Sequence, residues 1–473
     1  MPVPPQIQLS CSDRVKHDSS LYLKDLYFRL VSFKAESDKQ AMPHGGNNLK
    51  SSSDVSLESS GTKDDVSLEK TVTADTERDQ KSFGEGCDGG YGWFVVLGSF
   101  MVQITSFGVI SSCSDPKSLV NLSFVGTLAL IFSYGLSPIV QVCTSIYGVR
   151  AIMMVGTLLI VVSMEMAGFA TQVWHLYLTQ GVLFGIGASC MYVTVMAVTP
   201  QWFTRNRGIA LGIVAGGSGM GGLVIPLIYT SINQRLGSGW TYRIMGFICL
   251  ACDVLACVFV KEREKKRERK RLREIVQLDV LKNFNFLLFS VGSDIALLGY
   301  FVPLFFVPSY ASYLGLSESQ GSSLVSVASA MNFVGRLAAG LLGDRIGQLN
   351  SNIIFTIMSA LSNFLIWTFA YSYNSLIGFM VVYGFFCGSY FALMSNISAN
   401  LLGMAKFPSG LSFLLLINIV SVFGSNISSA IETGVSSEPY FSYKMFAGVA
   451  YLLGSLILIV LKLRLDRNPF AKV

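Results

Sequence analysis

The chain has 473 residues, of which 51% are hydrophobic and only 14% are charged. Apolar runs of about twenty residues recur along it, and runs of that length can cross a bilayer. This composition excludes a soluble protein with charged domain surfaces. The formal net charge of +6 lies in the joints between apolar runs, which argues for membrane orientation and against a nucleic-acid-binding patch.

The first 86 residues are rich in Ser, Asp, Lys, Glu and Thr. A segment of this composition cannot bury enough apolar surface to order itself. We therefore predict a disordered cytosolic tail over residues 1–86. No cleavable signal peptide is expected, because the first long apolar run begins only near Tyr91.

About twelve membrane-spanning helices are predicted from the apolar runs, each long enough at 1.5 Å per residue to cross about 30 Å. They cover residues 91–113, 119–143, 150–171, 174–199, 208–231, 240–260, 284–307, 320–343, 350–371, 376–399, 409–431 and 444–463. Basic residues follow every second span, most densely in KEREKKRERKRLRE at 261–274, whereas the opposite joints contain few. Cytosolic loops carry the excess of Lys and Arg, so both termini are expected in the cytosol.

The basic run separates two halves of six predicted spans each. The predicted units are an N-terminal half over 87–260, a cytosolic linker over 261–283, a C-terminal half over 284–463 and a cytosolic tail over 464–473. Two such halves are the plan of the major facilitator fold, in which the halves rock about a cavity at the middle of the membrane. We therefore expect an all-α integral membrane protein of this fold.

A glycine-rich motif stands at the entrance to the first span. It consists of Asp88, Gly89, Gly90, Tyr91, Gly92 and Trp93. An acidic residue before a helix meets the positive end of the helix dipole, and a tryptophan there can anchor at the membrane interface.

Two further motifs close the fourth and eighth spans. The stretch QWFTRNRGIALGIVAGGSGMGG contains Arg205 and Arg207 and spaces its small residues so that another helix can approach closely. The turn GDRIG contains Asp344 and Arg345. Together with the entrance motif, these stretches resemble the signatures of the monocarboxylate transporter family, a branch of the major facilitator superfamily, over about residues 88–463.

The resemblance implies transport of monocarboxylates such as lactate or pyruvate, commonly with a proton. The fungal branch also includes a riboflavin carrier. In the family pattern Asp344 and Arg345, with Arg205 and Arg207, belong to a cytosolic gate. The corresponding place in the first half reads TSIYGVR at 144–150 and keeps only part of the gate motif.

Arg336 is the central candidate for a binding site, because it lies about two turns inside the eighth span. An arginine at the bilayer centre costs roughly 2.5 to 3.5 kcal/mol on insertion scales, so it should face a protein interior and meet a partner. It matches the family's intramembrane arginine, whose guanidinium offers a planar fork to a carboxylate. In contrast, Asn332 stands where proton-coupled members have an aspartate, and Ser111 where they have a lysine.

Asp294 is the acid that could replace the missing one, because it is expected at a similar depth to Arg336. We hypothesise that Asp294 is the partner or proton carrier of Arg336; a structural ion pair or bonds to backbone donors are the alternatives. The predicted substrate site consists of Arg336, Asn332, Asp294, Ser111 and Phe107. Glu165 and Asp253 are expected to pair with neighbours.

The function expected from these features is secondary or facilitative transport of a small monocarboxylate or related metabolite by alternating access. The partners are a small-molecule substrate, with or without a proton, and the lipid bilayer; no nucleic acid, metal, cofactor or enzymatic activity is expected. The plasma membrane is the expected location, with a vacuolar or other internal membrane as the alternative.

Two other functions stay open. An uncoupled carrier of riboflavin or another aromatic solute is favoured by Asn332 and Ser111, which remove charges from the site. A non-transporting sensor or scaffold is disfavoured by the costly burial of Arg336.

Overall fold

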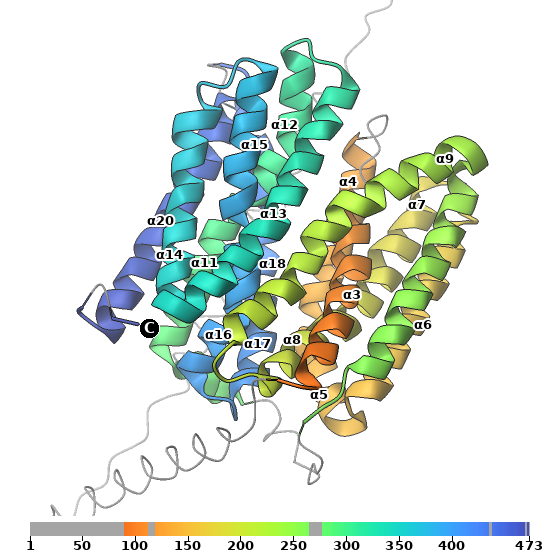
Figure 1. The fold of residues 1–473 in the computed structure, drawn as a ribbon. Coiled ribbons are helices and arrows are strands. Elements are labelled where there is room, and N and C mark those ends of the chain that lie inside the picture. The colour runs from red at the N-terminus through yellow and green to blue at the C-terminus, as the bar shows by residue number, and fades with distance from the viewer. Residues whose placement is uncertain (1–88, 112–118, 264–276, 435–437, 469–470, 473) are drawn as a thin grey trace, which may run out of the picture. The chain divides into compact units, whose positions relative to one another are not determined.

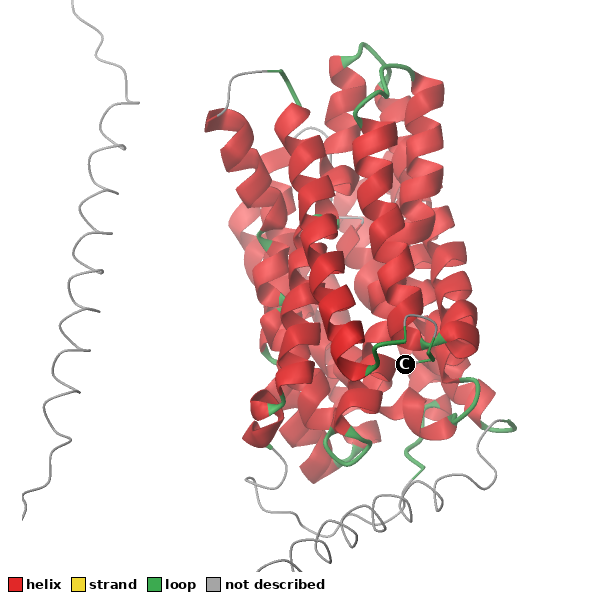
Figure 2. Cartoon of the chain, turned by 90° about the vertical axis from the view of Figure 1, so that its left-hand side faces the viewer, coloured by secondary structure: helices red, strands yellow, loops and turns green. Residues whose placement is uncertain are grey.

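Long helices run side by side in the computed structural model, which describes residues 89–111, 119–263, 277–434, 438–468 and 471–472 (Figure 1). Ten of the described helices are long and apolar enough to cross a membrane, and the bent pair Phe124–Gly135 and Ser137–Tyr147 adds an eleventh. These residues contain helices and loops only (Figure 2). The predicted tail, most of the linker and the motif residue Asp88 lie outside the described residues.

The N-terminal half is built from helices that alternate in direction, with short joints between them. They are α3 (Gly92–Ser111), α4 (Leu119–Gly135), α5 (Ser137–Tyr147), α6 (Val149–Ala167), α7 (Val173–Leu176) continued by a π-helical segment (Tyr177–Leu183), α8 (Phe184–Val198) with a final 3-10 turn (Thr199–Trp202), and α9 (Arg207–Phe259). α4 and α5 meet at an angle of 48°, just before Pro138. The second span is therefore bent, whereas a continuous helix was predicted.

α9 contains the fifth and sixth predicted spans. Its 53 residues are interrupted at Gly237, whose φ of 78° lies in the left-handed region that favours glycine. The predicted joint between residues 231 and 240 is thus reduced to one non-helical residue. Because α9 is counted once among the eleven spans above, its two parts bring the number to the twelve that were predicted.

The C-terminal half contains more helical pieces than predicted spans. They are a 3-10 turn (Leu278–Lys282), α11 (Phe284–Leu298), α12 (Phe301–Tyr313), α13 (Glu318–Ile346), α14 (Gln348–Leu361) with a π-helical end (Ser362–Trp367), α15 (Tyr373–Cys387), α16 (Ser389–Leu402), α17 (Phe407–Ile417), α18 (Ile419–Val422), α19 (Gly424–Gly434) and α20 (Phe441–Leu465). The seventh, tenth and eleventh spans are each broken.

The breaks lie at Gly299 and Tyr300, at Gly388, and at Asn418 and Phe423. They were not predicted, because the apolar runs continue through them. In transporters, irregular backbone inside the membrane is tolerated where it lines a cavity or is buried in protein. The three breaks therefore direct attention to the interior of the C-terminal half.

The two halves meet along α9 and α13, where small residues let the backbones approach. Gly208 and Gly340 face each other, and a Cβ atom added at Gly212 would lie 2.7 Å from the carbonyl oxygen of Arg336. A Cβ at Gly219 would lie 2.8 Å from the backbone nitrogen of Phe333. The glycine spacing read from the sequence thus corresponds to a close contact between helices of opposite halves.

Candidate functional site

Arg336 is buried, with 4% of its surface exposed. Its Nη1 donates to the carbonyl oxygen of Ala215 at 2.6 Å and to the Ser218 hydroxyl, both on α9, and its Nη2 donates to the Tyr300 hydroxyl at 3.3 Å. The guanidinium carbon lies 4.9 Å from the centre of the Phe391 ring. Arg336 therefore reaches from the C-terminal half to the N-terminal half.

One edge of the Arg336 guanidinium, formed by Nε and Nη2, makes few hydrogen bonds. Nε has no hydrogen-bond partner among the described residues, and Nη2 on the same edge has only the long bond to Tyr300. No ion pair joins Arg336 to an acid in the part of the chain that the structure describes. Nε and Nη2 are the two atoms that bind a carboxylate side-on. The geometry of this edge suits an organic anion.

Gly388, at the break between α15 and α16, stands against this edge. A Cβ atom there would lie 2.8 Å from Nε of Arg336 and 2.5 Å from Nδ2 of Asn332. Asn332 is itself buried, donates to the Cys387 sulfur at 3.2 Å and has an unpartnered Oδ1 among the described residues. The absence of a side chain at Gly388 lets the backbone at this break pack directly against Arg336 and Asn332.

Replacing Gly388 by alanine is expected to lower transport of a carboxylate substrate about tenfold, because the new methyl group displaces Arg336 and Asn332 from their positions. Uptake by purified protein in liposomes measures the effect. Gly378→Ala is the matched control, since Gly378 lies in the same span and a Cβ there meets nothing within 4 Å. Equal uptake by both variants would refute the importance of this edge.

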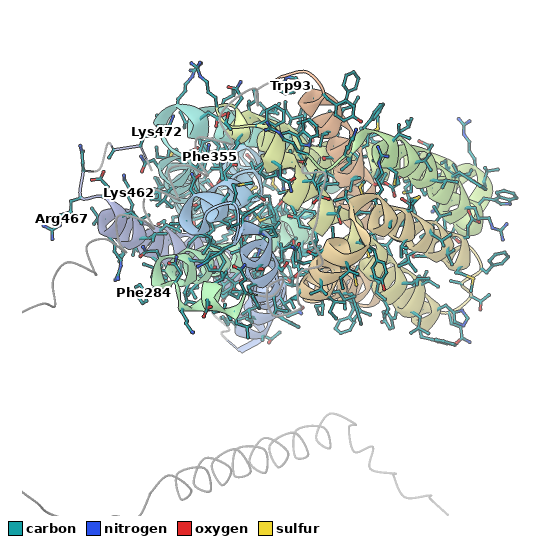
Figure 3. All side chains as sticks on the ribbon, turned by 90° about the horizontal axis from the view of Figure 1, so that it is seen from below. Trp93, Phe284, Phe355, Lys462, Arg467 and Lys472 are labelled. Carbon is teal, nitrogen blue, oxygen red and sulfur yellow. The ribbon has the colours of Figure 1, made fainter. Side chains whose placement is uncertain are left out.

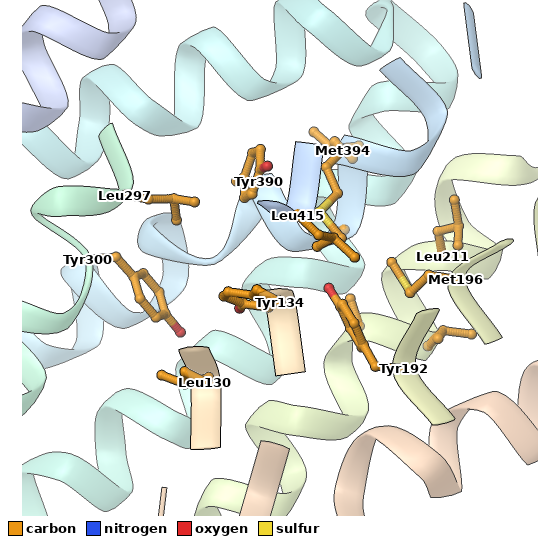
Figure 4. Close-up of a cluster of buried hydrophobic side chains, with 14 of the residues drawn as sticks. Leu130, Tyr134, Tyr192, Met196, Leu211, Leu297, Tyr300, Tyr390, Met394 and Leu415 are labelled. Carbon is orange, nitrogen blue, oxygen red and sulfur yellow. The ribbon is translucent and has the colours of Figure 1, made fainter. Parts of the chain in front are cut away.

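Four buried tyrosines lie close together, two from each half, and one of them, Tyr300, bonds Arg336. They are Tyr134 on α4, Tyr192 on α8, Tyr300 between α11 and α12, and Tyr390 on α16. Figure 4 shows their rings converging with apolar side chains between them. The predicted site residue Phe107 joins this group, with its ring centre 4.7 Å from that of Tyr192 and 6.1 Å from that of Tyr134.

Asp294 is buried on α11, but the structure does not pair it with Arg336. Ser421, at the broken eleventh span, is the group that bonds its carboxyl, and Oδ1 has no partner among the described residues. The hypothesis of a direct Arg336–Asp294 contact is therefore wrong for this conformation. The reason is that Arg336 points to α9 and Tyr300, whereas Asp294 points to α18.

The other polar candidates lie apart from Arg336. Ser111 is the last residue of α3, and its side chain is outside the described part of the structure. Asp253 is fully buried and accepts from the Thr105 hydroxyl at 2.7 Å, in line with the predicted pairing to a neighbour. Glu165 is partly buried with its Oε1 unpartnered within the described ranges.

The gate motif makes a contact between the halves. Asp344 Oδ1 accepts from the backbone nitrogen of Gly208 at 2.8 Å and Oδ2 accepts from that of Ile209 at 2.9 Å. The carboxylate of α13 thus caps the first turn of α9, where free N–H groups and the helix dipole favour an anion. Gln348 also donates to Oδ1, at 2.9 Å.

The remaining gate residues have different surroundings. Arg345 is exposed, and Arg207 donates from Nε to the carbonyl oxygen of Phe203. The chain after α20 returns to the gate, since Lys472 donates to the carbonyl oxygen of Asp344 and Lys462 donates to that of Ala471 at 2.7 Å. Figure 3 shows Lys462 and Lys472 at the same side of the bundle. Asp344, rather than Arg345, forms the contact between halves.

Two of the sequence motifs meet in space. The Trp93 ring packs edge-on against Phe203 with ring centres 5.2 Å apart, and a Cβ at Gly92 would lie 3.1 Å from the same ring. The Tyr91 ring lies tilted against the Trp202 ring, with ring centres 5.5 Å apart. The entrance of the first span is therefore packed against the end of the fourth, directly before the gate segment of α9.

Sequence reasoning missed Ser218, Tyr134, Tyr192 and Asn418. Asn418 donates to the Tyr390 hydroxyl at 2.8 Å from the break in the eleventh span. Tyr134 and Tyr192 stand in long apolar runs where nothing local separates a packing tyrosine from a lining one. Of these residues, only Asn418 could have been found from the sequence, because an amide inside a continuous apolar run needs hydrogen-bond partners.

The model of the Major Facilitator Superfamily matches residues 91–425 and 289–472. The chain belongs to this superfamily. The predicted fold is therefore confirmed, and the protein is a multi-pass membrane transporter of the superfamily. It is 30% identical over 387 residues to the fujikurins efflux protein of Gibberella fujikuroi, covering 79% of this chain and 83% of that protein.

Other relatives are also fungal transporters. The agnestins efflux protein AgnL12 of Paecilomyces divaricatus is 28% identical over 390 residues, covering 80% of this chain and 89% of the relative. The probable transporter MCH2 of Saccharomyces cerevisiae is 29% identical over 386 residues, covering 77% of this chain and 80% of that protein.

Solved structures share the fold of this superfamily member. The transporter FucP in the outward conformation superposes with a TM-score of 0.61 at 12% identity, over 78% of this chain and 98% of FucP. The human organic anion transporter MFSD10 gives a TM-score of 0.63, also at 12% identity, with the same coverage. At this identity the likeness is one of fold.

Proposed function

We propose that this superfamily member carries a small organic metabolite with a carboxylate group, and that Arg336 binds the carboxylate. The observation that supports the proposal is a buried guanidinium that has no acidic partner among the described residues and whose Nε makes no hydrogen bond with them. A buried charge without a counter-ion is costly. A transported anion would supply that counter-ion.

The bonds of Arg336 to α9 suggest how binding is coupled to movement. In this conformation Nη1 holds Ala215 and Ser218 of the opposite half. A carboxylate bound at Nε and Nη2 would attract the guanidinium and turn it, which would weaken the bonds of Nη1 to α9. Binding would then change the relative stability of the closed and open arrangements of α9 and α13, which is the differential interaction that alternating access requires.

The signature residues and Arg336 support the monocarboxylate branch of the superfamily. We propose that the gate end of α13, with Asp344, faces the cytosol, because the basic joints lie at the same ends of the spans. A carrier of riboflavin or another uncharged aromatic metabolite is the second candidate, supported by the four buried tyrosines that lie close together.

An uptake panel tests the proposal. Purified protein in liposomes is given labelled lactate, pyruvate or riboflavin, with and without a pH gradient. Carboxylate uptake that depends on Arg336 is expected. Riboflavin uptake that is unchanged by Arg336→Gln would favour the second candidate, and ligand binding without any uptake would favour a sensor.

Asp294 is proposed as the proton carrier, because it is a buried carboxyl with an unpartnered oxygen among the described residues and its neighbour Ser421 is not charged. Asp294→Asn is expected to remove the dependence of uptake on the pH gradient while exchange of substrate persists. Asp253→Asn is the control, since Asp253 is also a buried carboxyl with one unpartnered oxygen among the described residues, but it lies on α9 and accepts from Thr105 within the N-terminal half. A pH-dependent Asp294→Asn protein would end the proton-carrier role.

A further inference from the structure

The tyrosines around Arg336 form a wall shared by both halves of the bundle. Ring centres of Tyr134 and Tyr192 are 6.4 Å apart, and Phe391, which stacks with the guanidinium of Arg336, is 5.2 Å from Tyr300. All four tyrosines are at most 8% exposed. The rest of the wall is apolar, formed by Leu130, Leu297, Met196, Met394 and Leu415 (Figure 4).

The hydroxyl groups divide into two pairs. In the C-terminal half, Tyr300 accepts from Arg336 and Tyr390 is bonded to Asn418. In the N-terminal half, neither Tyr134 nor Tyr192 makes a hydrogen bond within the described ranges. Buried tyrosine hydroxyls usually find a partner. The hydroxyls of Tyr134 and Tyr192 can therefore still donate and accept hydrogen bonds.

Packing between helices would explain the buried aromatic rings. It would not explain why a guanidinium and two tyrosine hydroxyls without hydrogen bonds lie among them. The Arg336 guanidinium lies close enough to Tyr134 and Tyr192, whose hydroxyls are unused, to interact with them electrostatically, and it bonds Tyr300. A two- or three-carbon acid would engage only the cationic edge and would leave the rings without a partner. A flat ligand with one anionic end would use all three features, since aromatic rings attract one another beyond simple area burial.

We infer that the preferred substrate is an aromatic carboxylic acid, with its carboxylate on Arg336 and its ring against the tyrosines of the two halves. Tyr134 and Tyr192 then determine specificity, because their rings and hydroxyls face the part of the ligand that differs between aromatic acids. This inference rests on the proposed function, since it needs Arg336 to bind a carboxylate. It goes beyond that function by naming the ring as the second element of recognition.

The test compares four acids in liposomes that contain the purified protein: benzoate, 4-hydroxybenzoate, lactate and pyruvate. Benzoate is expected to exceed lactate at least tenfold in kcat/KM, the discrimination that a well-packed apolar group supplies. Tyr192→Leu should reduce this ratio about tenfold. Tyr147→Leu is the control, because Tyr147 is 70% exposed and lies outside the site.

Tyr134→Phe and Tyr192→Phe keep the rings and so avoid a packing defect. They are expected to lower the ratio of 4-hydroxybenzoate uptake to benzoate uptake severalfold, because only the hydroxylated ring loses a hydrogen-bond partner. Lactate uptake equal to benzoate uptake, with both lost in Arg336→Gln, would overturn this inference and leave the proposed function intact. Carboxylate uptake that is absent, or unaffected by Arg336→Gln, would overturn both.

Discussion

Replacing Arg336 by glutamine is expected to lower kcat/KM for a carboxylate substrate about 100-fold or more. Truncating one member of a buried, hydrogen-bonded charge pair costs about 2 to 5 kcal/mol, and each 1.36 kcal/mol is tenfold in rate. Arg336→Lys keeps the charge but not the planar fork, so an intermediate loss of about tenfold is expected. Initial uptake rates in liposomes over a range of substrate concentrations give these values.

Arg464→Gln is the matched control for this prediction. Its guanidinium also stacks on a ring, 4.5 Å from the centre of Phe284, but at the end of α20. The thermal midpoint of each purified variant separates a loss of folding from a loss of binding, because Arg336 also bonds Ala215 and Ser218. Carboxylate transport that survives Arg336→Gln in a folded protein would refute the anion site.

Replacing Asp344 by alanine is expected to open the contact between α9 and α13. The carboxylate holds two backbone N–H groups of the opposite half, and hydrogen bonds to a charged group contribute about 1.5 to 3 kcal/mol each. A loss of about 2 kcal/mol would lower the ratio of closed to open protein about 30-fold. The halves would then spend more time apart at this end.

Spin labels at Tyr147→Cys and Lys406→Cys can measure the opening, because these exposed residues belong to opposite halves and α5 packs against α17. The distance distribution should broaden toward longer values in Asp344→Ala. Asp279→Ala is the control, since its ion pair with Lys282 is exposed and within one half. Identical distributions in the gate variant and the unmodified protein would show that Asp344 is not part of the gate.

Arg336 and Asp344 lie about two turns apart on α13, and both contact α9. Arg336 bonds Ala215 and Ser218 near the middle of α9's first part, whereas Asp344 caps its beginning. A substrate that alters the Arg336 contact therefore acts on the same pair of helices that the gate holds together. This shared pair gives a short physical route from the binding site to the gate.

Much of the architecture was predictable because membrane spans depend on local properties. Apolar runs long enough for the bilayer, and basic residues in alternate joints, are visible without knowledge of any contact. The same local reasoning selected Arg336, since a charge inside an apolar run is costly wherever its partners lie. The spacing of small residues predicted the close approach at Gly212 and Gly219, whereas Asp344 was found through the resemblance of its turn to a family motif.

Partners could not be predicted, because they come from residues far apart in the sequence. Asp294 was expected beside Arg336 from depth alone, but the direction of each side chain around its helix decides contact, and Arg336 instead meets Ser218, which is 118 residues away. The breaks at Gly388 and Tyr300 were hidden within apolar runs. Local sequence alone determined the spans and the buried charge, whereas only the tertiary structure decided which groups surround that charge, since α9 and α13 come together only in the folded bundle.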